Sequence, residues 1–257
     1  MTQHLNYKSF GSGDTIIIMH GLLGMLDNWQ SFAKKLSERY RVLTLDLRNH
    51  GKSFHANQMT YELMSEDLNR FLIHREIDRA DIMGHSMGGK VAMQFALQYP
   101  EKTEKLIVAD IAPRAYPGGH ETIFEALLTA NPENAEKRSD IEKHLLKFIP
   151  DKSIVLFLMK NLSRSKNGGF RWKANIGALA DNYPHILAAI ESDRSFKGKS
   201  LFLKGGKSHY IDEKSTGEME KLFPENRLVE IPGAGHWIHA ESPVETLRAT
   251  VEFLGNN

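Results

Sequence analysis

Ser86 lies in the pattern Gly84-His85-Ser86-Met87-Gly88, directly after an apolar run and before an amphipathic segment. A serine hydroxyl is a weak nucleophile, so an enzyme that uses one presents it on a tight strand-to-helix turn, within reach of a base. Such a turn leaves room only for small residues at positions 84 and 88. The helix that begins at Met87 would also direct backbone N–H groups at a developing oxyanion. The pattern therefore predicts that Ser86 is the nucleophile of an acyl-transfer reaction.

A second segment fits the same chemistry. His20-Gly21-Leu22-Leu23-Gly24 follows the isoleucine-rich run 15–19, at the place where a loop can bring a second N–H donor to the oxyanion. We predict that the backbone N–H groups of Leu22 and Met87 form the oxyanion hole, with His20 in a supporting role. Alone, this segment would be interpreted as an ordinary strand-to-helix turn. Together with the Ser86 pattern, it is predicted to serve catalysis.

The general base is predicted to be His236, one of 12 histidines in the chain. It lies in Gly233-Ala-Gly-His236-Trp237, a glycine-rich turn between the last apolar run and the last predicted helix. Such a turn can bring an imidazole to the serine. His85 and Trp237 are adjacent to the two reacting residues and are expected to support them. Four other histidines are interpreted as surface or packing residues: His50, His120, His209 and His239.

Short apolar runs alternate with longer amphipathic segments along most of the chain, as expected for an α/β fold with a mostly parallel central sheet flanked by helices. Between about 113 and 196 the alternation stops, and helical patterns occur without a convincing strand. This predicts a helical cap inserted into a single domain that spans 1–257. Strands are predicted at 15–19, 41–46, 80–84, 105–110, 200–204 and 227–231; helices are predicted at 28–38, 60–75, 87–98, 121–129, 141–148, 153–161, 212–222 and 243–253.

Composition narrows the functional classes. The 257 residues carry 33 Lys+Arg and 32 Asp+Glu, a balance that gives no reason to expect a nucleic acid or an anionic membrane as partner. With no cysteine, disulfides, thiolate–zinc sites and thiol nucleophiles are excluded. No apolar run approaches the ~20 residues that span a bilayer, and Met1 to Phe10 lacks an apolar signal core. We expect a cytoplasmic enzyme that needs no metal or cofactor; the oligomeric state is left open.

Four motifs, in this order, resemble those of the α/β-hydrolase fold family over almost the whole chain. They are His20-Gly, Asp46-Leu-Arg-Asn-His-Gly-Lys-Ser53, Gly-His-Ser86-Met-Gly-Gly and Gly-Ala-Gly-His236-Trp. The resemblance implies a mostly parallel sheet with one antiparallel strand near the N-terminus. It also implies that Asp46 belongs to a structural loop and is not catalytic.

The acid of the triad is not at the position usual for this family, a Gly-x-x-Asp turn after the penultimate strand. Here that turn reads Gly205-Gly-Lys-Ser208, and a serine hydroxyl cannot supply the negative charge that stabilises an imidazolium. Asp212 and Asp110 are the two alternatives. Asp212 starts a predicted helix and is well explained as its N-cap. Asp110 ends the strand next to that of Ser86, where α/β sites assemble, and we favour it.

A subgroup of the family fits this arrangement. Asp46 to Ser53, Asp110-Ile-Ala-Pro113 and Gly205 to Ile211 resemble small bacterial esterases and thioesterases whose acid follows the sixth strand of the family's sheet. The resemblance implies a serine carboxylesterase acting on small acyl esters of short to medium chain length, or on acyl thioesters, with Ser208 as a partner near His236.

Three other functions remain open. A lyase of the menaquinone pathway is similar in size and nucleophile motif, but its acid follows the penultimate strand, where this chain has Ser208. A carbon–carbon bond hydrolase has the same fold, and a ligand sensor could retain the triad. A haloalkane dehalogenase is excluded, because it would need aspartate at position 86.

Overall fold

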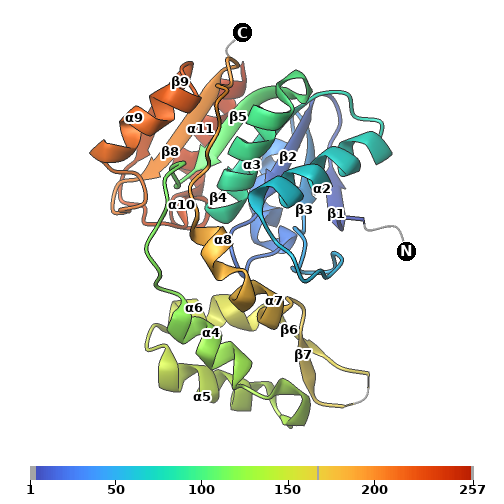
Figure 1. Cartoon of the computed structure of the whole chain (residues 1–257). Helices are drawn as coiled ribbons and strands as arrows, with labels where there is room; N and C mark the ends of the chain where they lie inside the picture. The colour runs from blue at the N-terminus through green and yellow to red at the C-terminus, as the bar shows by residue number, and fades with distance from the viewer. Residues whose placement is uncertain (1–3, 167, 256–257) are drawn as a thin grey trace.

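A seven-stranded sheet forms the centre of the computed structural model, which describes residues 4–166 and 168–255. The strand order is β1-β3-β2-β4-β5-β8-β9 (Figure 1). Only β1 is antiparallel to its neighbour, and the other six strands run parallel. The predicted α/β fold, with its antiparallel N-terminal strand, is confirmed. The strands are β1 (Tyr7–Phe10), β2 (Thr15–Met19), β3 (Arg41–Leu45), β4 (Ala80–His85), β5 (Thr103–Ala109), β8 (Ser200–Gly205) and β9 (Asn226–Ile231).

The central strands are buried on both faces, which explains why they appear in the sequence as continuous aliphatic runs. In β2, alternate residues belong to different core clusters: Ile17 packs with one set of helices, and Ile16 and Ile18 pack with the other. The first set comprises α2 (Tyr61–His74), α3 (Met87–Gln98) and α9 (Glu213–Leu222); the second comprises α1 (Gln30–Leu36), α10 (Ile238–Glu241) and α11 (Pro243–Gly255).

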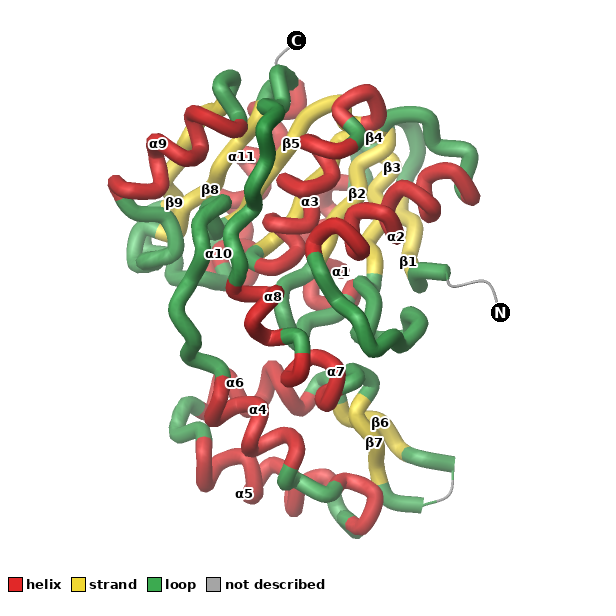
Figure 2. The backbone as a smooth tube through the Cα atoms, in the orientation of Figure 1, coloured by secondary structure: helices red, strands yellow, loops and turns green. Residues whose placement is uncertain are grey.

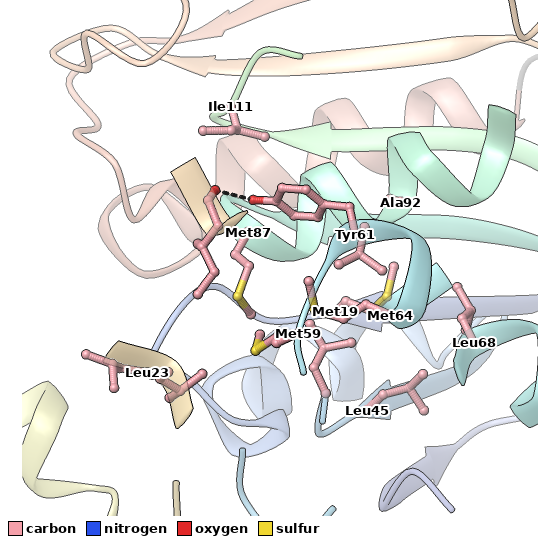
Figure 3. Close-up of a cluster of buried hydrophobic side chains, with 14 of the residues drawn as sticks. Met19, Leu23, Leu45, Met59, Tyr61, Met64, Leu68, Met87, Ala92 and Ile111 are labelled. Atoms are coloured by element: carbon pink, nitrogen blue, oxygen red, sulfur yellow. Dashed lines mark hydrogen bonds between the residues drawn. The ribbon is translucent and has the colours of Figure 1, made fainter. Parts of the chain in front are cut away.

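Helix α2 shows how the sequence sets a helix boundary and its buried face. The side chain of Thr60 accepts a hydrogen bond from the N–H of Leu63 and caps the first turn. Met64 and Leu68 lie at helical spacing and are almost completely buried. Figure 3 shows both of them packed in one apolar cluster with Met19 and Leu45 of the sheet.

The segment between β5 and β8 forms a separate group of elements at one end of the sheet (Figures 1 and 2). Its helices are α4 (Glu121–Leu128), α5 (Arg138–Phe148), α6 (Lys152–Met159), α7 (Ile176–Asp181) and α8 (Tyr183–Leu187). We call this group, residues 113–196, the cap. The two ends of the cap lie side by side, because the N–H of Ile190 donates to the carbonyl oxygen of Pro113 over 2.6 Å.

The expectation that no strand interrupts the cap was wrong. Strands β6 (Leu162–Arg164) and β7 (Phe170–Trp172) pair as an antiparallel hairpin, with Leu162 opposite Trp172. Each strand has only three residues, too few to show the period-two alternation that marks a strand. In the turn-rich segment that suggested a loop, residues 163 and 164 belong to β6, and residues 165, 166, 168 and 169 lie between the two strands.

Other differences are small. The predicted helix 28–38 is a short 3₁₀ turn (Leu26–Trp29) followed by α1, and α7, α8 and α10 were not predicted. Two further 3₁₀ turns occur at Pro100–Lys102 and Pro132–Asn134. Among the described residues, no helix has the length and apolar character needed to cross a membrane.

Candidate active site

Ser86 lies between the last residue of β4 and the first residue of α3, with φ 53° and ψ −121°. A non-glycine residue at positive φ is strained and is retained where its surroundings hold it in place. The two flanking glycines permit the turn. A Cβ atom on Gly84 would lie 2.0 Å from the carbonyl oxygen of Gly88, and one on Gly88 would lie 2.5 Å from that of His20. The backbone thus holds the hydroxyl-bearing residue at the tip of a sharp turn.

Ser86 opens into a cavity that His236 also lines. This cavity has a volume of about 230 Å³, and Leu22, Trp237 and Phe157 contribute to its wall. The rings of Trp237 and Phe157 lie 5.6 Å apart, so the cap and the turn after β9 meet across it. The predicted nucleophile and the predicted base, 150 residues apart in sequence, therefore face one space.

The imidazole of His236 is held by Asp110. His236 Nδ1 and Asp110 Oδ2 are 2.7 Å apart, and the aspartate is completely buried. The same carboxylate accepts hydrogen bonds from the Ser208 hydroxyl and, over 2.8 Å, from the N–H of Gly205. Because Nδ1 is used by the carboxylate, Nε2 is the nitrogen that remains for a substrate or for Ser86.

Asp110 follows β5, which is the fifth strand of this chain in sequence order. Its φ of 52° is in the left-handed region, where aspartate and asparagine are tolerated better than most residues. The alternative acid, Asp212, lies elsewhere: it caps α9 by accepting a hydrogen bond from the N–H of Ser215, and it pairs with Arg114 at 3.4 Å. Of the two candidates, the structure brings Asp110, not Asp212, to His236.

The predicted oxyanion donors also line the space beside Ser86, since Leu22 and Met87 both border a second, larger cavity with it. Neither N–H donates a hydrogen bond to any other described residue. The carbonyl oxygen of Gly21 accepts from His20 Nδ1 over 2.8 Å and from the N–H of Gly24 over 3.0 Å. In a trans peptide the N–H points opposite to the carbonyl, so these bonds turn the Leu22 N–H away from the loop.

Several buried histidines surround the site, and burial keeps them uncharged. It lowers the pKa of His20 to about 4 and the pKa of His50 to about 3. The pKa of His85 is also held well below its usual value, mainly by burial. His20 Nε2 accepts from the N–H of Leu47, and His50 Nε2 accepts from that of Leu23, each over 3.1 Å. These rings act as fixed hydrogen-bonding groups for the loops.

His85 contributes to the turn that carries the base. Its Nε2 lies 2.8 Å from the carbonyl oxygen of His236, and the two rings are 4.6 Å apart. Since the pKa of His85 is low, this nitrogen carries the single ring proton and donates it to the carbonyl. His239 stacks on Trp29 at 4.1 Å and lines the smaller cavity, so it packs against the site as well.

Sequence reasoning missed several residues of the site. The ring of Tyr210 stacks on that of His236, with centroids 4.0 Å apart. His120 lines both cavities and His209 lines the larger one, although both were interpreted as surface or packing residues. Lys90 is buried beside the larger cavity. Of these residues, only Lys90 could have been noticed in the sequence, because it is the one charged residue in the otherwise uncharged segment 87–98.

Asp46 lies in a structural loop, as the resemblance implied. Its carboxylate accepts hydrogen bonds from the N–H of Leu26 over 2.8 Å, from the Asn6 side chain over 2.7 Å and from the N–H of Lys52 over 2.9 Å. The side chain is buried, and none of these partners faces Ser86.

Known proteins that are similar to this chain belong to the class that its fold indicates. Residues 14–243 match the family described as the alpha/beta hydrolase fold, and the chain belongs to this family. It is 34% identical to the Escherichia coli protein named Esterase YbfF, over 94% of this chain and 93% of that one. It is 38% identical to the Danio rerio protein named sn-1-specific diacylglycerol lipase ABHD11, over 98% of this chain and 82% of that one.

A solved structure described as a marine microorganism esterase is similar as well. It superposes with a TM-score of 0.96 at 42% identity, covering 98% of this chain and all of the other. The sheet, the flanking helices and the cap of this chain therefore occur together in a protein of comparable length.

Proposed function

We propose that this carboxylic ester hydrolase works through a Ser86–His236–Asp110 triad and an acyl-enzyme intermediate. The observation that carries the proposal is that Ser86, His236 and Asp110 come together at one end of the sheet. A serine on a strained turn shares a cavity with an imidazole whose other nitrogen is held by a buried carboxylate at 2.7 Å. This is the arrangement that acyl transfer by serine requires.

In the first half of the reaction, Ser86 Oγ attacks the ester carbonyl carbon while His236 Nε2 takes its proton. Asp110 keeps the ring in the tautomer with a proton on Nδ1 and stabilises the imidazolium. The negative charge that forms on the carbonyl oxygen is received by the N–H groups of Leu22 and Met87. Each donor of this kind contributes about 10²–10³ in rate. His236 then protonates the leaving alcohol, and the acyl group stays on Ser86.

In the second half, water replaces the alcohol. His236 removes a proton from the water, which attacks the acyl-enzyme, and the acid leaves with Ser86 regenerated. Ser208 supports both halves, because its hydroxyl donates to the same Asp110 oxygen as His236 does. His20 orients the Leu22 donor through the Gly21 carbonyl oxygen.

We further propose acyl chains of short to medium length as substrates, with thioesters as a second possibility. The cavity beside Ser86 that Met87 lines has a volume of about 590 Å³, within the 300–1,000 Å³ range of small-molecule pockets. The family likeness to a protein named as a diacylglycerol lipase makes glycerides worth including among the test substrates.

The test is a series of p-nitrophenyl esters, acyl-CoAs and glycerides of graded chain length, assayed with the wild type and with Ser86→Ala. We expect turnover of the esters to fall by ~10⁴–10⁶-fold in Ser86→Ala, with an unchanged circular dichroism spectrum. Ser12→Ala is the matched control, since Ser12 is exposed, and its activity should equal that of the wild type. Substantial hydrolysis by Ser86→Ala would contradict the assignment, and slow turnover with cap rearrangement on ligand binding would favour a sensor.

A further inference from the structure

Two cavities meet at Ser86, and they differ in which catalytic groups they contain. The larger one, of about 590 Å³, is lined by Met87 but not by His236; the smaller one, of about 230 Å³, is lined by His236 but not by Met87. We call them the large arm and the small arm. Because His236 must protonate the leaving alcohol, the alcohol belongs in the small arm. The acyl chain then extends into the large arm.

The large arm contains the amine of Lys90, which forms no ion pair with a carboxylate of the described residues. Lys90 lies one helical turn after Ser86, and its backbone N–H donates to the Ser86 carbonyl oxygen over 3.1 Å. The residue is 1% exposed, and its side chain lines the arm. The ammonium group donates to the carbonyl oxygen of Ala188 over 2.5 Å and lies 4.8 Å from the centre of the Tyr116 ring.

A second cation borders the same arm. The guanidinium carbon of Arg114 lies 4.3 Å from the centre of the Tyr116 ring, so both cations contact one aromatic side chain. Arg114 pairs with Asp212 at 3.4 Å, but its Nε atom is buried with no hydrogen-bond partner among the described residues. One of its donors is therefore satisfied by an exposed carboxylate, while another is left without an acceptor.

No aspartate or glutamate is among the described residues that line the large arm. The rest of the wall is mostly apolar or aromatic, with His120 and His209 as its other titratable basic groups. Figure 3 shows part of this wall, with Met87, Ile111 and Tyr61 close together and the Tyr61 hydroxyl donating to a carbonyl oxygen of α8. Burial, followed by the neighbouring charge of Arg114, lowers the pKa of Lys90 to about 7. Two cations held near each other in such surroundings are stabilised when an anion binds between or beside them.

We propose that the large arm selects acyl chains that end in a carboxylate, so that the preferred substrates are half-esters of dicarboxylic acids. Lys90 and Arg114 bind the distal carboxylate, and the apolar wall contacts the methylenes between it and the ester. The inference rests on the proposed esterase function, since it takes Ser86 as the origin of the chain. It goes beyond that function by naming the group at the far end of the acyl chain.

The test compares half-esters with neutral esters of the same length. Monomethyl esters from succinate to suberate are assayed beside the methyl esters of the corresponding monocarboxylic acids, such as monomethyl adipate beside methyl hexanoate, by following methanol release. For the wild type we expect kcat/KM for the half-ester to exceed that for the neutral ester at the best chain length. In Arg114→Met and in Lys90→Met this ratio should fall at least fivefold, mainly through turnover of the half-ester.

Arg171→Met is the matched control, because Arg171 is exposed on β7 of the cap, away from the arm; its ratio should equal that of the wild type. A wild type that hydrolyses the neutral ester as well as the half-ester at every length overturns the proposal, as does an unchanged ratio in Arg114→Met. If Lys90→Met fails to fold, Arg114→Met alone decides.

Failure of the esterase function is separated from failure of this inference by a binding measurement. Ser86→Ala is titrated with monomethyl adipate and with methyl hexanoate in a calorimeter, so that no turnover is needed. Tighter binding of the half-ester, lost in the double variant Ser86→Ala/Arg114→Met, supports the inference even if no ester is hydrolysed by the wild type. Equal binding of the two compounds refutes it.

Discussion

Replacing Asp110 by asparagine removes one negative charge while keeping the shape of the side chain. The backbone at Asp110 has φ 52°, a conformation that asparagine tolerates as well as aspartate does. The asparagine oxygen can still accept from the N–H of Gly205, which lies 2.8 Å from Oδ1. The amide group then occupies the place of Oδ2, where its hydrogens face the donors of His236 and Ser208.

The expected loss follows from these contacts. Two hydrogen bonds to a charged acceptor are lost, each worth about 1.5–3 kcal/mol. At about 1.4 kcal/mol for each factor of ten, kcat should fall by about 10²–10⁴-fold. The upper end applies if the imidazole adopts the other tautomer, in which Nε2 carries the proton and cannot accept one from Ser86.

The assay measures kcat and KM for one p-nitrophenyl ester, together with the melting temperature. Asp212→Asn is the control, since this residue caps α9 and contacts neither Ser86 nor His236. It should cost about 1 kcal/mol of stability at most and leave kcat within about threefold. Asp110→Asn retaining more than about a tenth of kcat, or Asp212→Asn alone losing activity, would refute the assignment of the acid.

Three further changes test the surroundings of the site. Ser208→Ala removes one hydroxyl donor to the buried carboxylate and should lower kcat about tenfold, as measured by steady-state kinetics. An unchanged kcat would contradict the supporting role of Ser208. Gly88→Ala places a Cβ atom 2.5 Å from the His20 carbonyl oxygen and should cost about 2 kcal/mol or more of unfolding free energy in urea, whereas Gly217→Ala, with open space around it in α9, should be neutral or stabilising. Burial raises the pKa of Asp81 from 3.8 to about 7, so the folded state binds this proton more tightly and loses stability as the pH rises between these values. At a pH above about 7, Asp81→Asn should therefore increase the unfolding free energy by up to about 4 kcal/mol and raise the melting temperature, whereas below about pH 4 it should bring no such gain. An equal effect at both pH values would contradict this reasoning.

The sequence predicted the sheet well because its strands are buried on both faces and bounded by turns. The run 15–19, for example, coincides with β2. The hairpin at Leu162–Arg164 and Phe170–Trp172 was missed, because three-residue strands carry no periodic signal. Helix α10 was missed for a similar reason, since four residues make only one turn.

The candidate site was predictable where function depends on local backbone geometry, and less so where it depends on contacts between distant segments. The turn around Ser86 requires glycine at two fixed positions, and this requirement is visible in the sequence. The stacking of Tyr210 on His236 depends on how two loops approach each other. The same holds for Lys90 and Arg114, which become neighbours only when the start of the cap folds over α3.

The order of the strands explains why these distant segments meet. Strands β4, β5 and β8 are adjacent, and the pairing continues past their ends: the N–H of Ser86 donates to the Ala109 carbonyl oxygen over 3.0 Å, and that of Asp110 to Leu203 over 2.7 Å. These bonds hold both strained residues, at φ 53° and φ 52°, in one row with Gly205. The connection from β5 to β8 must leave the sheet immediately after Asp110. That connection is the cap, which begins directly after the segment that carries Asp110 and supplies one wall of the large arm. A change in the cap is therefore expected to alter substrate choice while Ser86, Asp110 and His236 keep their places.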